Sequence, residues 1–317
     1  MKEALKLILK GATMGVAEVI PGVSGGTLAF ITGIYERLLS AINAINFKLI
    51  SVLKNEGLKG VWSQIDGNFL FKILFGMAIG FSVGLKIIVG LLESHPIHVW
   101  SFFFGLIIAS IPLITKQIKR WRLTEILIFI FGFGLVYWIT IASPSTGSNH
   151  LAMVFLSGIL GVSALMLPGL SGSFVLLLLG MYTIIMPAIK DFISNPFGPE
   201  LQIVVVFGLG MLIGLFTFSK LLGYTFDKYP NQTLALLSGF LVGSLNKVWP
   251  WQHVTSTRIN SKGEQVVKFS ESILPSTFSD LEENPLYGKD PHILSCVILM
   301  AVAVVLILCL DRFSSKK

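Results

Sequence analysis

Six long apolar segments decide what kind of fold this chain can adopt. They cover approximately residues 69–92, 98–115, 122–142, 200–222, 231–248 and 292–310. Each is long enough to cross a hydrocarbon core of about 30 Å as an α-helix. Only 13% of the 317 residues are charged, against about 25% in soluble domains. The pattern predicts an all-α polytopic integral membrane protein.

The basic residues predict how the chain crosses the membrane. Residues 116–122 hold four cations, and cytoplasmic loops carry an excess of Lys and Arg. Counting from this loop places both termini in the cytoplasm and a long polar segment, at about 251–291, outside. Residues 254–269 predict a small β-hairpin, with a disordered or capping loop as the alternative. Because the cations lie at the ends of apolar segments, the net charge of +7 reflects topology, and no nucleic-acid partner is expected.

The N-terminal segment carries Lys2, Lys6 and Lys10 at four-residue spacing. This spacing interrupts any signal-peptide core. On a helix it gives one basic stripe, which we expect to face the lipid surface.

The chain contains an internal repeat. Residues 11–42 resemble residues 158–189 at an offset of 147, and the spans that follow resemble each other at an offset of 134. The identical pairs include Pro21 and Pro168, Ser24 and Ser171, Tyr35 and Tyr182, and Lys86 and Lys220. Shared Pro, Ser, Lys and Tyr are less expected by chance than shared apolar residues. We predict a duplication, with a first repeat at 1–142 and a second at 150–311.

Each repeat consists of one interrupted apolar pair followed by three full crossings. This odd number of crossings inverts the second repeat relative to the first. Inverted repeats build transporters, in which discontinuous helices meet near the bilayer midplane at the substrate site. The interrupted pairs are either re-entrant hairpins or full crossings. The architecture predicts a transporter.

The interruptions coincide with two copies of the motif PGxSG. Proline cannot continue a helix, and glycine permits a sharp reversal. The helix that restarts behind them exposes backbone N–H groups and the positive end of its dipole, which attract phosphate or another anion. A hairpin turn that only lets helices pack closely is the alternative. Because the motif occurs twice, we favour a phosphate site formed by Gly22, Ser24, Gly25, Gly26, Thr27, Gly169, Ser171, Gly172 and Ser173.

Charged residues near the motifs are further candidates. Three roles are open for Glu18 inside its apolar segment: it carries a proton, pairs with a cation, or accepts backbone N–H groups. Arg37 either binds a phosphate bidentately or marks the cytoplasmic interface beside Glu36. The repeat-equivalent Lys86 and Lys220 either snorkel to the interface or capture lipid head groups.

Residues 14–27, MGVAEVIPGVSGGT, and residues 30–38, FITGIYERL, carry a family resemblance. They resemble the signature of a family of bacterial and archaeal polytopic membrane proteins assigned as polyprenyl-phosphate transporters. The similarity spans nearly the whole chain and includes the degenerate second motif at 167–173, LPGLSGS.

This resemblance implies transport of undecaprenyl phosphate, a lipid carrier, from the outer to the cytoplasmic leaflet of the plasma (inner) membrane during cell-envelope synthesis. It also implies roles for the residues that match the family pattern, Glu18, Tyr35, Glu36 and Arg37. The second half has Leu165 in place of the acid and Thr183-Ile184 in place of Glu-Arg, although Tyr182 is kept. A symmetric mechanism with two acids is therefore not expected.

Two other function classes fit parts of the sequence. Facing helix ends also suit a small inorganic anion channel or exchanger. Residues 22–26 match the GxSxG of serine hydrolases, but the five histidines lie in loops or at membrane ends, so we expect no enzyme. No cofactor or metal is expected, because two histidines in a loop, His95 and His98, are weak evidence for a metal site and the two cysteines lack metal spacing. The oligomeric state is left open.

Overall fold

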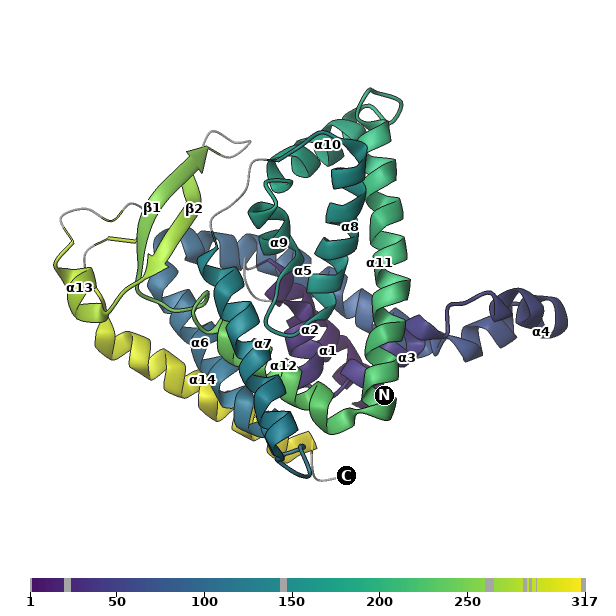
Figure 1. Cartoon of the computed structure of the whole chain (residues 1–317), viewed down its shortest axis with the longest axis horizontal. Coiled ribbons are helices and arrows are strands. Elements are labelled where there is room, and N and C mark those ends of the chain that lie inside the picture. Colours follow the sequence, from purple (N-terminus) through teal and green to yellow (C-terminus); the bar gives the residue numbers. More distant parts are fainter. Residues whose placement is uncertain are drawn as a thin grey trace. The chain divides into compact units, whose positions relative to one another are not determined.

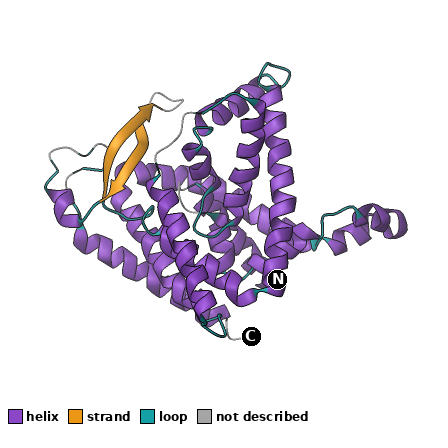
Figure 2. Cartoon of the chain, viewed as in Figure 1, coloured by secondary structure: helices purple, strands orange, loops and turns teal. Residues whose placement is uncertain are grey.

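The computed structural model describes residues 2–19, 24–142, 147–259, 265–281, 284, 287–288 and 290–314. These residues form helices almost throughout, with one two-stranded sheet (Figure 2). The prediction of an all-α polytopic membrane protein is confirmed. The inverted topology and the cytoplasmic termini stay predictions.

Four helices among the described residues are long and apolar enough to cross a membrane. They are α5 (Gly67–Ser94), α6 (Pro96–Thr115), α7 (Leu123–Ile141) and α11 (Leu201–Lys228). Two further helices have shorter apolar stretches: α8 (Leu151–Met166), and α14 (Ile293–Ser314), whose apolar part is Ile293–Cys309. The predicted apolar segment at 231–248 corresponds to α12 (Pro230–Ser244), which has only 15 residues.

The chain forms two compact units, and each contains parts of both predicted repeats. The first unit comprises Met1–Leu85 and Pro144–Thr233, and the second comprises Lys86–Ser143 and Leu234–Lys317. Besides most of α5 and all of α8 and α11, the first unit holds α1 (Lys2–Glu18), α2 (Gly25–Ile31), α3 (Tyr35–Asn43), α4 (Lys48–Gln64), α9 (Gly172–Leu178) and α10 (Tyr182–Ser194) (Figure 1). The duplication at 1–142 and 150–311 stays a prediction, and the compact units combine parts of both predicted repeats.

Glycines at repeat-equivalent positions let helices of the first unit pack at backbone distance. A Cβ on Gly76 would lie 2.1 Å from the carbonyl oxygen of Ile8, and a Cβ on Gly210 would lie 2.2 Å from that of Phe155. The two glycines are 134 residues apart and their partners 147 apart, which are the offsets of the predicted duplication. Small residues allow such close approach between membrane helices. The matched contacts support the duplication.

Both PGxSG segments separate two helices. At the first segment, α1 ends at Glu18 and α2 begins at Gly25. At the second segment, α8 ends at Met166 and α9 begins at Gly172. The seven residues of α2 or α9 extend only about 10 Å, so neither crosses a bilayer alone. α9 and α10 meet at an angle of 118°, as in a broken span or a re-entrant loop. The two options for the interrupted pairs both remain.

The polar segment of the second unit contains the predicted hairpin. β1 (Gln252–Ile259) pairs antiparallel with β2 (Gln265–Ser272), and the short helix α13 (Pro275–Ser279) follows. The indole of Trp249 donates to the carbonyl oxygen of Ile273 at 2.8 Å, and that of Trp251 donates to Pro291 at 2.8 Å. The described residues of this segment are therefore folded against their own unit.

Candidate functional site: the paired interrupted helices

The N-terminus of α2 is capped by groups from its own half of the chain. Ser24 is the N-cap, and its Oγ accepts from the N–H of Gly26 at 3.0 Å. The carboxylate Oε1 of Glu18 accepts from the N–H of Gly25 at 2.6 Å. Glu18 thus takes the third of its predicted roles in this conformation. An acidic group from the chain itself already lies at the helix end, where its ionised form interacts favourably with the dipole.

The N-terminus of α9 has a hydroxyl cap but no acid. Ser171 accepts from the N–H of Phe174 at 3.2 Å, and its Oγ lies 2.9 Å from that of Ser173. Leu165 holds the position equivalent to Glu18. Ser171 is buried, whereas Ser173 is exposed. The second motif is therefore the neutral one of the pair, and it is reached from the surface at Ser173.

The two motifs lie against each other through hydrogen bonds between hydroxyl groups of the first half and backbone groups next to the second interruption. In two of the three bonds the hydroxyl donates to a carbonyl, and in the third the N–H of Gly169 donates to the hydroxyl. The inter-motif hydrogen bonds are Ser24 Oγ to the Leu165 carbonyl at 3.0 Å, Tyr35 Oη to the Met166 carbonyl at 2.7 Å, and the Gly169 N–H to Thr27 Oγ1 at 2.9 Å. Carbonyls at a helix end lack intrahelical partners, so these bonds satisfy groups that the break in α8 leaves open.

The glycines of the motifs allow this contact. A Cβ on Gly26 would lie 2.7 Å from the carbonyl oxygen of Leu165, and a Cβ on Gly172 would lie 2.5 Å from that of Gly161. Both are backbone atoms, so a side chain would push the segments apart. Close packing, the alternative role of the motif, is thus present in the structure. Gly22, a predicted site residue, lies outside the described residues.

Tyr35 is anchored by aromatic contacts as well as by its hydroxyl. Its ring centroid lies 5.2 Å from that of Phe30 and 5.9 Å from that of Phe226, and the side chain is buried. The equivalent Tyr182 packs beside a cluster of buried apolar side chains that includes Met181. The Tyr35 hydroxyl reaches the backbone next to the second motif.

Arg37 lies away from the inter-motif hydrogen bonds. Its Nε donates to Asp66 Oδ2 at 2.7 Å, and its guanidinium carbon lies 4.3 Å from the centroid of the Phe69 ring. Arg37 and its neighbour Glu36 are exposed. Asp66 was missed by sequence reasoning, because a single acid just before a span carries no spacing signal. The phosphate role of Arg37 stays a prediction.

Lys86 and Lys220 occupy the same place in their helices. Each is the twentieth residue of a 28-residue helix, α5 and α11 respectively, and each side chain is exposed. Both of their predicted roles, at the interface or on lipid head groups, remain predictions.

Lys10 differs from its predicted role. Instead of only forming the basic stripe, its ammonium donates to the carbonyl oxygen of Thr32 at 2.6 Å. Thr32 is the C-cap of α2, and a cation there interacts favourably with the helix dipole. With Glu18 at the other end, this seven-residue helix has an acidic group at one terminus and a basic group at the other.

Three histidines of the second unit form a cluster that the sequence did not indicate. The ring of His98 lies 5.8 Å from that of His95 and 5.0 Å from that of His292, between centroids. Its Nε2 is 2.8 Å from the hydroxyl of Ser295. Across the described part of the chain, no group of His, Cys, Asp and Glu is arranged to hold a metal ion.

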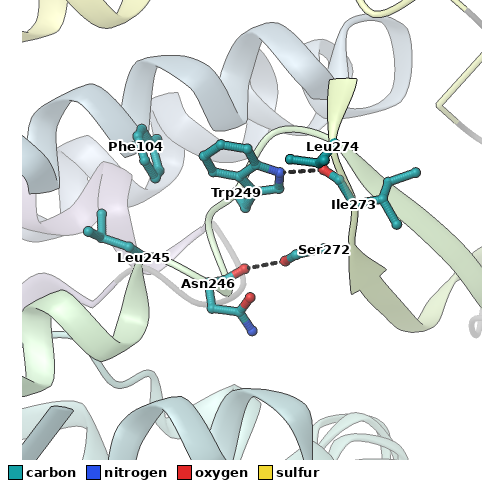
Figure 3. A pocket seen from close by; sticks show the side chains of 7 residues that line it. All are labelled: Phe104, Leu245, Asn246, Trp249, Ser272, Ile273 and Leu274. Carbon is teal, nitrogen blue, oxygen red and sulfur yellow. Dashed lines mark hydrogen bonds between the residues drawn. The ribbon is translucent and has the colours of Figure 1, made fainter. Parts of the chain in front are cut away.

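A pocket of about 370 Å³ lies in the second unit, beside the hairpin (Figure 3). Its lining residues carry no formal charge; they are Phe104, Leu245, Asn246, Trp249, Ser272, Ile273 and Leu274. Trp249 donates to Ile273 and Ser272 donates to the carbonyl of Asn246 at 2.9 Å. Because these polar groups bond to one another and no cation is present, the pocket does not suit a phosphate.

Long apolar helices together with two interrupted helices that meet through their motifs define the class as a polytopic membrane transporter. Interrupted helices in contact are the usual core of this class. The chain belongs to the family described as undecaprenyl phosphate translocase-like, whose profile matches residues 14–266.

Two curated relatives share one name with each other, polyprenyl-phosphate transporter. A protein of Vibrio cholerae named polyprenyl-phosphate transporter is 41% identical over 312 residues, which is 98% of this chain and 97% of that protein. A protein of Staphylococcus aureus with that name is 32% identical over 256 residues, 77% of this chain and 85% of that protein. No solved structure matches the chain.

Proposed function

We propose that this protein carries a polyprenyl phosphate, most simply undecaprenyl phosphate, from the outer to the cytoplasmic leaflet of the plasma (inner) membrane. The lipid carrier is then reused in cell-envelope synthesis. The observation that carries the substrate class is the similarity to the Vibrio cholerae polyprenyl-phosphate transporter over nearly the whole length of both chains. Membrane lipids surround the protein as its other partners.

The phosphate head group binds, in this proposal, between the two PGxSG motifs. Three observations support the location: the motifs are in contact, each restarts a helix behind a serine cap, and Ser173 is exposed at the neutral second motif. Backbone N–H groups at helix starts favour phosphate. The inter-motif hydrogen bonds bury Ser24 and Thr27 in the present conformation, so binding requires the motifs to separate.

The proposed site is tested with a triple variant, Ser24→Ala, Ser171→Ala and Arg37→Ala, in proteoliposomes. Each hydrogen bond to a charged group contributes about 1.5–3 kcal/mol, so transport is expected to fall at least about tenfold. A matched control replaces an exposed serine and an exposed arginine outside the motifs, Ser82→Ala and Arg120→Ala. The assay follows the leaflet in which undecaprenyl phosphate is accessible. Unchanged transport by the triple variant would exclude the site.

In this proposal, Glu18 is the residue that couples transport to protons. A phosphate that approaches α2 meets the carboxylate of Glu18, and two like charges disfavour each other. Uptake of a proton by Glu18 removes this repulsion. The same residue would therefore couple entry of the phosphate to entry of a proton.

The variant Glu18→Gln separates the charge from the hydrogen bond, since a glutamine oxygen still accepts from the N–H of Gly25. We expect transport to lose its dependence on a proton gradient, while the folded protein keeps its thermal stability. Glu18→Asp, which keeps the charge, serves as the control. Transport and internal pH are recorded together in the same vesicles. Gradient-driven transport by Glu18→Gln at the parental rate would rule out this role.

The remaining alternatives have less support. The curated relatives are named transporters, and Ser24 donates its hydroxyl proton to a backbone carbonyl, which does not activate it as a nucleophile. The serine-hydrolase interpretation is therefore set aside. An anion channel would conduct chloride or inorganic phosphate without an isoprenoid tail, and ion-flux measurements in the same proteoliposomes distinguish it from the proposed transporter.

A further inference from the structure

The helix α4, between α3 and α5 (Figure 1), consists of exposed and half-buried residues, although many of them are apolar. None of its residues is buried. Leu58 in this helix is 79% exposed, and Phe47, the residue directly before the helix, is 92% exposed. The described residues of the chain do not cover this apolar surface, which raises the question of what does.

The apolar residues of α4 fall into two groups. Leu49, Ile50, Val52 and Leu53 lie on one side of the first half, and Leu58, Val61 and Trp62 lie on one side of the second. At about 100° per residue, a continuous helix would point the two sides roughly 150° apart. A straight α4 could not place both groups on one flat surface.

Gly57 resolves this conflict. Its backbone has φ 67° and ψ −164°, so it interrupts the helix between the two groups. This left-handed conformation favours glycine over residues with a Cβ. Because the helix is interrupted at Gly57, the direction of the second half's apolar side is not fixed by that of the first. Both halves can therefore direct their apolar sides towards the same surface.

The charges of α4 match an anionic surface. Lys48, Lys54 and Lys59 are all exposed, against the single acid Glu56. In their own halves, each lysine lies about 110–120° from the middle of the apolar side, where its ammonium reaches head groups. Apolar residues on one side with lysines at its edges are typical of helices that lie in a membrane interface.

The position of α4 in the chain supports a membrane as the occupant. α4 is followed within three residues by α5, a candidate membrane span. Trp62 donates from its indole to Asn68 Oδ1 at 3.2 Å, which ties α4 to the first turn of that span. Tryptophan is enriched at membrane interfaces.

We propose that α4 is a two-part interfacial helix that binds the anionic phospholipid head groups of the leaflet in which α5 begins. The predicted topology makes this the cytoplasmic leaflet. Anionic lipids give that surface a negative potential, which attracts basic segments beside a span. The proposal requires only insertion of α5 and does not depend on the transported substrate.

Spin labels on the full-length protein in nanodiscs test the proposal. In a variant without Cys296 and Cys309, single cysteines are placed by Leu53→Cys and Leu58→Cys on the apolar sides. Asn55→Cys on the polar side is the matched control. Discs of phosphatidylcholine are compared with discs that also contain phosphatidylglycerol. Oxygen partitions into the bilayer and a nickel chelate into water, so their collision rates report depth.

In anionic discs, we expect the labels at positions 53 and 58 to collide more with oxygen and the label at 55 more with nickel. Lys48→Gln, Lys54→Gln and Lys59→Gln together should abolish the difference between the two lipid compositions. The proposal is overturned if all three labels are equally accessible to nickel. It is also overturned if dilution with unlabelled protein relieves spin–spin broadening, which would mean that a second copy covers α4.

The variant Gly57→Ala tests whether the interruption at Gly57 sets the orientation of the second half of α4 relative to the first. Alanine disfavours the left-handed conformation, so the two halves should join into one helix. The label at position 58 should then move into water, while the label at 53 stays in the bilayer. If both labels keep their depth, Gly57 does not set the orientation of the second half.

Discussion

Replacement of Gly210 by valine is expected to destabilise the protein by about 3 kcal/mol or more, whereas the same replacement at Gly208 should have little effect. Both glycines lie in α11, two residues apart. A Cβ at position 210 would meet the carbonyl oxygen of Phe155 at 2.2 Å, but a Cβ at 208 has no atom within 4 Å. Relief of the contact requires α8 and α11 to separate, because the atom that is struck belongs to a helix backbone.

Thermal unfolding of the purified protein in detergent measures this difference. At roughly 2–4 °C per kcal/mol for a domain of 150–250 residues, Gly210→Val should lower the Tm by about 10 °C. Gly208→Val is the control for the change in helix propensity, which both variants share. Equal shifts in the two variants would mean that the close approach of α8 and α11 does not limit stability.

Thr27→Val should produce the second large effect, on both stability and transport. The variant keeps the shape of threonine but removes the oxygen that accepts from the N–H of Gly169. Thr27 is 1% exposed, so water does not replace the lost acceptor. An unsatisfied buried donor costs about 1–3 kcal/mol. We also expect slower transport, because the second interruption loses one of its ties to the first.

Thr27→Ser is the matched control, since serine keeps a hydroxyl oxygen at the same place. Thermal unfolding and leaflet-resolved transport are measured for both variants. The hydrogen bond is important if serine restores most of the loss seen with valine. Similar losses for serine and valine would instead indicate that packing of the threonine methyl group is what stabilises the contact between the motifs.

Local features of the chain were predictable because they depend on neighbouring residues. The apolar segments became helices, the two PGxSG segments interrupted helices, and β1 paired with β2 as in the expected hairpin. Ser24 and Ser171 became the N-caps of α2 and α9, as their position before a helix start indicates. Periodicity, helix breakers and caps all act over a few residues, so they can be read directly.

Contacts between distant residues were not predictable in the same way. Arg37 pairs with Asp66, Lys10 binds the end of α2, and three histidines from separate segments come together. Each contact depends on how helices far apart in the chain pack. Long polar side chains also reach several partners, and a single sequence contains no record of which one is chosen.

The sequence by itself determined that the chain is a membrane protein, where its helices break, and that two halves share a motif with one acid, Glu18, in the first. Only the tertiary structure decided what the motifs do to each other. The hydroxyl of Ser24 caps its own helix, as its position indicates, but it also donates to the carbonyl of Leu165, and the hydroxyl of Tyr35 donates to that of Met166, both at the end of α8. The physical reason is that a break in a helix leaves backbone groups unpaired, and in a buried site the nearest donors must satisfy them.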